Sequence, residues 1–264
     1  MARPVVALLT DFGTEDHYVG VMKGVVLGIC SEATVVDISH GVPAHDVITA
    51  SLELAASYKY FPAGTVFLVV VDPGVGSVRR GLAADVGDFR FIAPDNGVLT
   101  AVFKELPPKS IVELTERRFA RPTVSRTFEG RDRFAPSAAW LAKGVELSAL
   151  GRPVTNYKQL DLPMPKVEDG RIIGEVVLVD RFGNLITNID RKTFERLARS
   201  GSIKIEIADK DIGRLVETYE DISVNEVCAL FGSRERLEFA ASAASAAEFL
   251  AVKRGELVVV HSGE

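Results

Sequence analysis

The stretch PVVALLTDFGTEDHYVG (Pro4–Gly20) joins an apolar run to an acidic loop and then to an apolar repeat. The run Val5–Thr10 is apolar and rich in β-branched residues, which predicts a buried strand. Apolar side chains at helical spacing from Tyr18 to Cys30 predict a helix. Three acids lie between these two segments: Asp11, Glu15 and Asp16. Ligands of α/β sheets bind where strands end, so this acidic cluster predicts a binding site.

The same alternation of strand and helix continues to about residue 147. Further strands are predicted at Thr34–Ser39, Thr65–Val71, Phe89–Ala93 and Ile111–Thr115. Further helices are predicted at Asp46–Phe61, Asn96–Leu106 and Asp132–Val145. This alternation is typical of a layered α/β domain with a mostly parallel sheet, which we expect over residues 1–162.

The second half of the chain has a different pattern. The tract Leu160–Gly170 contains two prolines and breaks the periodicity, which predicts a linker. Short strand-like runs follow at Ile172–Val179, Ile203–Ile207, Val227–Phe231, Leu237–Ala241 and Leu257–His261. Helical stretches are confined to Lys192–Arg199 and Ala243–Ala251. We therefore expect a smaller all-β domain, a barrel or a sandwich, over residues 170–264.

Composition limits the class of protein. The 31 basic and 36 acidic residues give a net charge of −5, and no basic run is present to neutralise nucleic acid, so no nucleic-acid partner is expected. The apolar run near the N-terminus is too short for a membrane span or a signal sequence, which predicts a cytoplasmic protein without a membrane partner. Cys30 and Cys228 lie far apart, as buried thiols in a reducing compartment would.

A second candidate site lies in VVVDPGVGSVRRG (Val69–Gly81), where a predicted strand ends at Asp72. Its glycines do not form a dinucleotide loop, because Arg79 stands at the third glycine position and no helix pattern follows. Asp72 could simply cap the Pro-Gly turn. A functional role is favoured because Asp95 and Asn96 also follow a strand, so that three strand ends carry polar groups suited to one crevice.

Two further polar segments are candidates. In TFEGRDRFAPSAAWLA (Thr127–Ala142), Asp132 fits a helix N-cap, whereas Glu129 precedes the helix and is free to face a crevice. In VDRFGNLITNID (Val179–Asp190), Phe182 and Asn184 offer an aromatic face and an amide, which together suit a purine. A buried core position is the alternative for Phe182.

Metal ligation is another alternative for the acidic and histidine residues of the first half. Candidate ligands in the first half are Asp11, Asp16, His17, His40, His45 and Asp72. The chain has four histidines and neither an HExxH motif nor a cysteine cluster, so we expect no metal and no cofactor.

Seven segments together resemble one family along nearly the whole chain and in the same order. They are TDFGTEDHYVGVMKG, DISHGVP, VVVDPGVGSVRR, APDNGVLT, TFEGRDRFAPSAA, VDRFGNLITNI and FGSRERLEFAASAASAA. The chain resembles the S-adenosyl-L-methionine (SAM) hydroxide adenosyltransferases, which are related to fluorinases and chlorinases. The resemblance implies an α/β domain followed by a β-barrel. It also implies a homotrimer whose active sites lie between one subunit's N-terminal domain and a neighbour's C-terminal domain.

The resemblance also implies roles for individual residues. Asp11 would hold the ribose diol, and a carboxylate can accept two hydroxyl hydrogen bonds at once. Asp16 and Tyr18 would face the methionine end, and His45 occupies the position where the halogenating relatives have a tryptophan over the ribose. Asp180, Ser233 and Arg234 would bind the methionine ammonium and carboxylate. The adenine pocket would be formed by Phe182, Asn184, Glu238 and the backbone of Ala240.

The reaction implied is in-line attack of water or hydroxide at C5′ of SAM, which releases adenosine and L-methionine. Asp72 and Arg79 match two residues that the family uses to hold the water. The third is a histidine in the common TFHGRD motif, and Glu129 stands in its place here. We expect Glu129 to take the histidine's role, with a raised pKa on one of the two carboxylates that share Arg79. The alternatives are a SAM-dependent halogenase and a non-catalytic adenosine or SAM binder.

Overall fold

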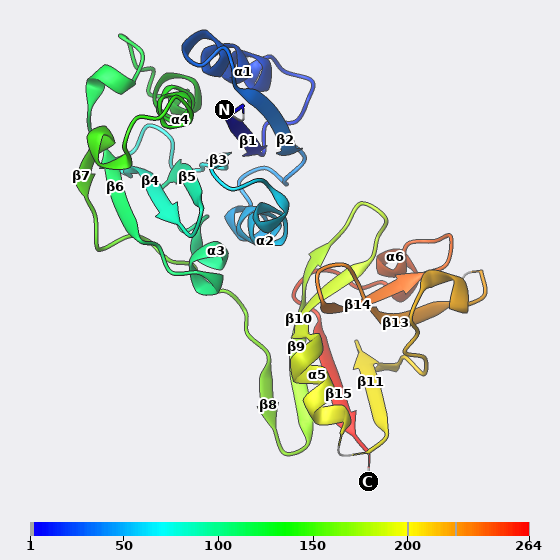
Figure 1. Ribbon diagram of the computed structural model, residues 1–264. Helices are drawn as coiled ribbons and strands as arrows, with labels where there is room; N and C mark the ends of the chain where they lie inside the picture. The colour runs from blue at the N-terminus through cyan, green and yellow to red at the C-terminus, as the bar shows by residue number, and fades with distance from the viewer. Residues whose placement is uncertain (1–2, 200, 225, 264) are drawn as a thin grey trace. The chain divides into compact units, whose positions relative to one another are not determined.

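The computed structural model describes residues 3–199, 201–224 and 226–263, and the chain divides into two compact units, Met1–Asp161 and Leu162–Glu264 (Figure 1). The boundary falls inside the stretch predicted as a linker. Part of that stretch, Lys166–Glu168, forms strand β8, which pairs with a strand of the second unit. Among the described residues, no helix combines the length and the apolar character needed to cross a bilayer.

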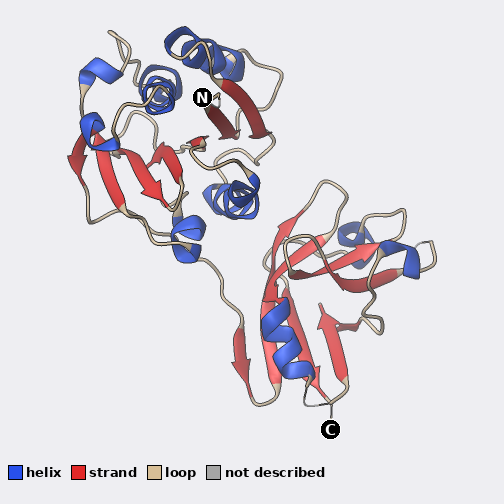
Figure 2. Cartoon of the chain, viewed as in Figure 1, coloured by secondary structure: helices blue, strands red, loops and turns tan. Residues whose placement is uncertain are grey.

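The first unit is built on a seven-stranded sheet with the order β2-β1-β3-β5-β4-β6-β7 (Figure 2). The strands are β1 (Val5–Thr10), β2 (Thr34–Ser39), β3 (Val66–Val70), β4 (Gly81–Val86), β5 (Phe89–Pro94), β6 (Ser110–Leu114) and β7 (Gly151–Pro153). The helices are α1 (Tyr18–Ile29), α2 (Val47–Ser57), α3 (Thr100–Glu105) and α4 (Ala135–Ala142).

The sheet is mixed, and the expectation of a mostly parallel sheet holds only in part. The pairings β2–β1, β1–β3 and β3–β5 are parallel, whereas the pairings β5–β4, β4–β6 and β6–β7 are antiparallel. The sequence pattern missed β4 because it reads GLAADV, with little β-branched character. Strands β4 and β5 are joined by the two residues Gly87 and Asp88, and such a short connection can link only antiparallel strands.

Helices cover both faces of this sheet. On one face, Met22 of α1 and Ala138 of α4 pack in a common core with Leu68 and other strand residues. On the other face, Tyr58 follows α2 and lies edge-on to Phe67 and Phe91, whose rings stack at 4.9 Å. Successive residues of β3 point to opposite faces of the sheet, and helices cover both faces. All five residues of β3 are therefore buried.

The second unit is an antiparallel sheet with the order β12-β11-β15-β9-β10-β14-β13, with β8 on β9. The remaining strands are β9 (Arg171–Val179), β10 (Leu185–Asp190), β11 (Ile203–Ile207), β12 (Lys210–Asp211), β13 (Val227–Phe231), β14 (Arg236–Ala241) and β15 (Leu257–Ser262). Helices α5 (Arg191–Ala198) and α6 (Ala246–Leu250) fall in the two stretches of sequence that were predicted to be helical.

Strand β9 gives this sheet its curl. Its first part, Arg171–Glu175, pairs with β15, and its last part, from Val176 on, pairs with β10. At the change, a side chain on Gly174 would come within 2.5 Å of Asn188 Oδ1, so the close approach of β10 requires glycine. Among the described residues no pairing joins the end strands β12 and β13. The unit is therefore a curled half-barrel, which agrees in part with the barrel expected.

Candidate active site

Three charged side chains form a buried cluster in the first unit. Arg79 donates from Nε to Asp72 Oδ1 at 3.0 Å, and its Nη2 lies 2.5 Å from Asp72 Oδ2. The same Nη2 donates to Glu129 Oε2. The side chains of Asp72, Arg79 and Glu129 are 5%, 4% and 11% exposed. The structure thus brings together the three residues predicted to act on water.

Local chain geometry explains how the cluster forms. Asp72 follows β3 after one residue, and a tight turn reverses the chain, with the Val75 amide donating to the Asp72 carbonyl at 3.2 Å. Gly76 has φ +77°, and a Cβ there would lie 2.5 Å from the Arg126 carbonyl oxygen. Arg126 Nη2 in turn donates to the Gly76 carbonyl at 2.7 Å. This glycine therefore docks the Asp72–Arg79 loop against the segment that leads to Glu129.

Burial raises the pKa of Asp72 above its ordinary value, and the neighbouring Glu129 carboxylate adds to the rise. The ion pair with Arg79 and a hydrogen bond from the Gly74 backbone act in the opposite direction without cancelling the pKa increase. Asp72 therefore does cap its turn, as one interpretation of the sequence had it, and it also pairs with Arg79. A carboxylate with a raised pKa is a stronger base than an ordinary aspartate and is better suited to accept a proton.

Glu129 sits at the start of a π-helical turn, Gly130–Phe134, which leads directly into α4. Such turns re-aim side chains and are frequent at functional sites. The turn places Arg133 Nη2 3.6 Å from Glu129 Oε1, so that Glu129 faces two guanidinium groups. Asp132 is not the N-cap of α4, and that prediction is wrong. Its carboxylate is fully buried and accepts hydrogen bonds from Arg131 and from the Ser125 amide.

The loop after β1 carries the next predicted residues. Asp11 Oδ2 accepts a hydrogen bond from the backbone of His45, whose φ of +67° is rare for a residue with a side chain. Asp16 and His45 are exposed. The Tyr18 ring lies 5.2 Å from that of Phe128, the neighbour of Glu129 in sequence. The loop thus reaches the Glu129 segment through aromatic contacts.

His40 holds the loop after β1 in place through hydrogen bonds. Its ring is buried, with Nδ1 2.8 Å from Thr10 Oγ1 and Nε2 3.0 Å from Asp37 Oδ1, and its carbonyl accepts the Gly13 amide. These contacts give His40 a structural role. In the described parts of the chain, no three His, Cys, Asp or Glu side chains are grouped as metal ligands would be.

Asp95 and Asn96 have partners other than the Arg79 cluster. The buried Asp95 carboxylate pairs with Arg80 at 2.5 Å and accepts the Lys158 amide at 2.8 Å. Asn96 donates to the Val71 carbonyl at 2.8 Å. Both residues therefore brace the strand ends, so the idea that all three strand ends share one crevice receives no support at Asp95.

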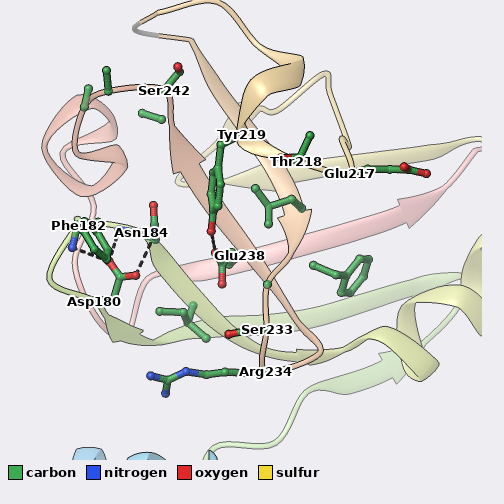
Figure 3. Close-up of a pocket in the computed structure, with 17 residues that line it drawn as sticks. Asp180, Phe182, Asn184, Glu217, Thr218, Tyr219, Ser233, Arg234, Glu238 and Ser242 are labelled. Atoms are coloured by element: carbon green, nitrogen blue, oxygen red, sulfur yellow. Dashed lines mark hydrogen bonds between the residues drawn. The ribbon is translucent and has the colours of Figure 1, made fainter. Parts of the chain in front are cut away.

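The second unit contains a cavity of about 850 Å³ (Figure 3). Six residues predicted to bind substrate line it: Asp180, Phe182, Asn184, Ser233, Arg234 and Glu238. Ala240 lies instead within the β13–β14 ladder opposite Cys228, while its neighbours Ala241–Ala244 form part of the wall. Cys30 and Cys228 are both buried free thiols, as predicted.

The turn between β9 and β10 organises one wall of this cavity. Asp180 Oδ1 accepts the amides of Phe182 and Asn184, each at 2.9 Å, and its Oδ2 accepts from the Asn184 side chain at 2.9 Å (Figure 3). Asn184 is thereby held in place and buried. Phe182 is 77% exposed, which excludes the alternative of a core phenylalanine and leaves its ring available for stacking.

Tyr219 points toward Glu238, as Figure 3 shows, and its hydroxyl donates to Glu238 Oε1 at 2.8 Å. Burial raises the pKa of the Glu238 carboxyl, and the charge of Asp180 adds to the rise. Burial and the bond to Glu238 raise the pKa of Tyr219 to about 12. The cavity therefore offers a ligand the hydrogen-bonded Tyr219 hydroxyl and Glu238 carboxyl, together with the side-chain amide of Asn184.

Sequence reasoning missed the segment Glu217–Tyr219, which also lines the cavity. It lies in an irregular stretch that ends in a short 3₁₀ turn with a capping box between Thr218 and Asp221. The available sign was a single aromatic residue within the acidic run ETYED. Without strand or helix periodicity, nothing in the sequence placed that tyrosine beside Glu238.

Family models match both units of the chain. The model described as the SAM hydroxide adenosyltransferase N-terminal domain matches residues 6–151, and the corresponding C-terminal domain matches residues 174–259.

Individual proteins match over almost the full length. An (R)-S-adenosyl-L-methionine hydrolase of Salinispora tropica is 35% identical over 263 residues, covering 98% of each chain. One of the same name from Thermus thermophilus is 36% identical over 96% of this chain and 97% of its own. A fluorinase of Actinoplanes sp. is 28% identical over 98% and 97%. The crystal structure of an uncharacterized conserved protein from Thermotoga maritima superposes with a TM-score of 0.92, at 37% identity over 97% of this chain and 99% of that one.

Proposed function

The chain belongs to the SAM hydroxide adenosyltransferase family, and on that premise we propose that it hydrolyses SAM to adenosine and L-methionine. The enzyme is thus a SAM hydrolase, which is the name of its full-length relatives at 34–36% identity. The single observation that carries the mechanism is the buried cluster of Asp72, Arg79 and Glu129, in which two carboxylates share one guanidinium.

The chemistry asks little of the protein at the leaving group. A sulfonium departs readily from C5′, so the enzyme has to hold a water in line behind that carbon and accept its proton. We assign proton acceptance to Asp72, whose pKa is raised by burial, and orientation of the water to Arg79 and Glu129. Arg133, which faces Glu129, offsets the charge that glutamate adds where the family pattern has histidine.

The remaining assignments follow the resemblance. Asp11 would hold the ribose diol, Asp16 and Tyr18 the methionine end, and His45 the edge of the ribose site. In the cavity of the second unit, Asn184, Phe182 and Glu238 would hold adenine, with the backbone of Ala240. Asp180, Ser233 and Arg234 would hold the amino-acid end. Asn184 and Glu238 line the same cavity, and this supports the adenine assignment.

A homotrimer is part of the proposal, since the resemblance implies one. Its support is that the residues assigned to one substrate are divided between the two units of the chain. Light scattering coupled to size-exclusion chromatography should give three times the chain mass. A monomeric mass with full activity would contradict the trimer.

One incubation tests the proposed reaction. Purified protein is mixed with SAM, with and without chloride, and the products are separated by chromatography. Adenosine and methionine in both samples are expected. Formation of 5′-chloro-5′-deoxyadenosine would identify a halogenase, which the two buried carboxylates disfavour because they repel a halide. Intact SAM with measurable binding would identify a binder.

A further inference from the structure

A second cavity of about 730 Å³ lies in the first unit, and none of the residues assigned to substrate lines it. Its walls come from the end of β6, from the short 3₁₀ helix Arg117–Phe119 with the loop after it, and from the start of α4. Four arginines line it: Arg117, Arg118, Arg121 and Arg133. Only two acids, Glu113 and Glu116, line it as well, so the lining carries a net positive charge.

The guanidinium groups of this arginine cavity are weakly paired. Arg121 lies 3.6 Å from Asp132, Arg133 lies 3.6 Å from Glu129, and Arg118 lies 4.0 Å from Glu116. A charge-assisted hydrogen bond is shorter, about 2.7–2.9 Å. Arg117 has no ion-pair partner within the described ranges. By contrast, Arg79 has carboxylates of both Asp72 and Glu129 in close contact. The cavity therefore keeps N–H donors that its own acids do not satisfy.

We propose that the arginine cavity binds a small molecule that carries a polyphosphate group. Each guanidinium presents five donors in a planar fork that matches phosphate oxygens two at a time. Four such groups have enough donors to engage more than one phosphate, and the volume lies within the range of ordinary small-molecule sites, roughly 300–1,000 Å³. The chemistry therefore fits pyrophosphate or the polyphosphate tail of a nucleotide.

Occupancy of this cavity also reaches the candidate active site. Arg133 lines the cavity and is at the same time the second cation beside Glu129. A bound polyphosphate competes for its guanidinium and leaves Glu129 with Arg79 alone. This second part rests on the proposed function, and it makes the polyphosphate an inhibitor of SAM hydrolysis.

Isothermal titration calorimetry of the full chain with sodium pyrophosphate tests the binding, at ionic strength matched with sodium chloride. The double variant Arg117→Gln, Arg118→Gln removes two exposed cavity charges. The matched control Arg196→Gln, Arg199→Gln removes two exposed arginines at the end of α5. Saturable binding is expected for the unchanged chain and the control, with affinity at least tenfold lower in the cavity variant. A single Arg117→Gln variant serves if the double variant loses its circular dichroism spectrum.

Several results would overturn the proposal. Absence of saturable heat from pyrophosphate, or equal affinity in all three proteins, removes the site. Equal affinity for inorganic phosphate and pyrophosphate removes the polyphosphate assignment. Titration with a nucleoside triphosphate and with its monophosphate then distinguishes a free pyrophosphate site from a nucleotide site.

Turnover measurements test the link to Arg133 separately. Pyrophosphate should slow adenosine release by the unchanged chain and by the control, and the cavity variant should lose this response. Binding without any change in turnover would overturn the link and leave the site standing. If the protein releases no adenosine at all, the proposed function fails, while the calorimetry still decides whether the site exists.

Discussion

At the scale of single residues, Glu129 is the feature that distinguishes this chain from the motif of its family. A neutral histidine beside Arg79 and Asp72 would leave that cluster without net charge. Glutamate adds a negative charge within a site that water barely reaches, and Arg133 on the same turn supplies a second cation. Charge balance is therefore achieved with four groups where the family pattern uses three.

The change Glu129→Gln tests this residue by rate and by pH profile. If Glu129 orients the water, adenosine release should fall by about 10²-fold or more, the usual contribution of a positioned proton-handling group. Activity should require ionised Asp72, so it is present above the raised pKa of Asp72 and lost as the pH falls through it. Removing the Glu129 charge removes one cause of that rise, so the acid limb of the residual activity should move to lower pH.

The control for this experiment is Glu195→Gln, an exposed glutamate on α5 in the other unit. It should leave both the rate and the acid limb in place. Unchanged turnover in Glu129→Gln would take Glu129 out of the mechanism. An acid limb that stays fixed would mean that Asp72 is not the group that titrates.

At the scale of elements, a side-chain cap at the start of α5 stabilises the second unit. Helix α5 shows a complete cap: Asp190 Oδ1 accepts the Thr193 amide at 2.8 Å and Oδ2 accepts the Thr193 hydroxyl at 3.0 Å. Burial alone would raise the pKa of Asp190, but these hydrogen bonds outweigh it, and the pKa lies below its ordinary value. The ionised cap therefore stabilises the second unit.

The change Asp190→Ala should lower the free energy of unfolding by about 1 kcal/mol, measured by urea denaturation at neutral pH. Asp190→Asn should lose much less, because asparagine caps about as well as aspartate. The charge-dependent part of the stabilisation is present above the ordinary aspartate pKa and is lost as the pH falls through the lower folded value. Equal losses in both variants at neutral pH would show that the cap bonds are not the cause.

Elements with their own pattern could be predicted from the sequence, and elements that depend on their neighbours could not. Strand β3 was predictable because all five of its residues are apolar and buried. Strand β4 was not, because Gly81, Ala83 and Ala84 have low strand propensity and are held by pairing with β5 and β6. Strand β7 was missed as well, so the antiparallel pairings of β4 and of β7 were not expected.

The candidate site divides in the same way. Asp72, Arg79 and Glu129 could be named from motifs, and the structure brings them together. Tyr219 and the two contacts of Arg133 could not, since they depend on an irregular loop and on a π-helical turn that no simple periodicity encodes. Asp132 misled for a related reason: it has the chemistry of a cap but lies inside that turn.

At the scale of the whole molecule, each unit has its own apolar core. In the first, α1 and α4 pack on the sheet around residues such as Met22 and Leu68. In the second, Phe194 and Leu197 of α5 pack against strand residues including Phe239 and Val260. Neither of these cores contains residues of the other unit.

We therefore expect fragments 1–161 and 162–264 to fold separately when expressed alone. Each should give a native-like circular dichroism spectrum and a cooperative thermal transition, because each retains its core. Neither alone should release adenosine from SAM, since the residues assigned to the substrate are divided between them. A fragment that stays unfolded would show that its core is insufficient without the other unit, and an active fragment would contradict the division of the site.

The contact between Gly76 and Arg126 has a consequence for engineering chimeras of this enzyme. The Arg126 carbonyl oxygen leaves no room for a side chain at position 76, and the Arg126 guanidinium donates a hydrogen bond to the Gly76 carbonyl. A chimera could take from a fluorinase only the Asp72–Arg79 loop, or only the segment around Arg126. In either case a fluorinase segment would have to pack against a segment of this chain to which it is not matched. The two segments therefore depend on each other, and chimeras between hydrolase and halogenase should exchange both segments together.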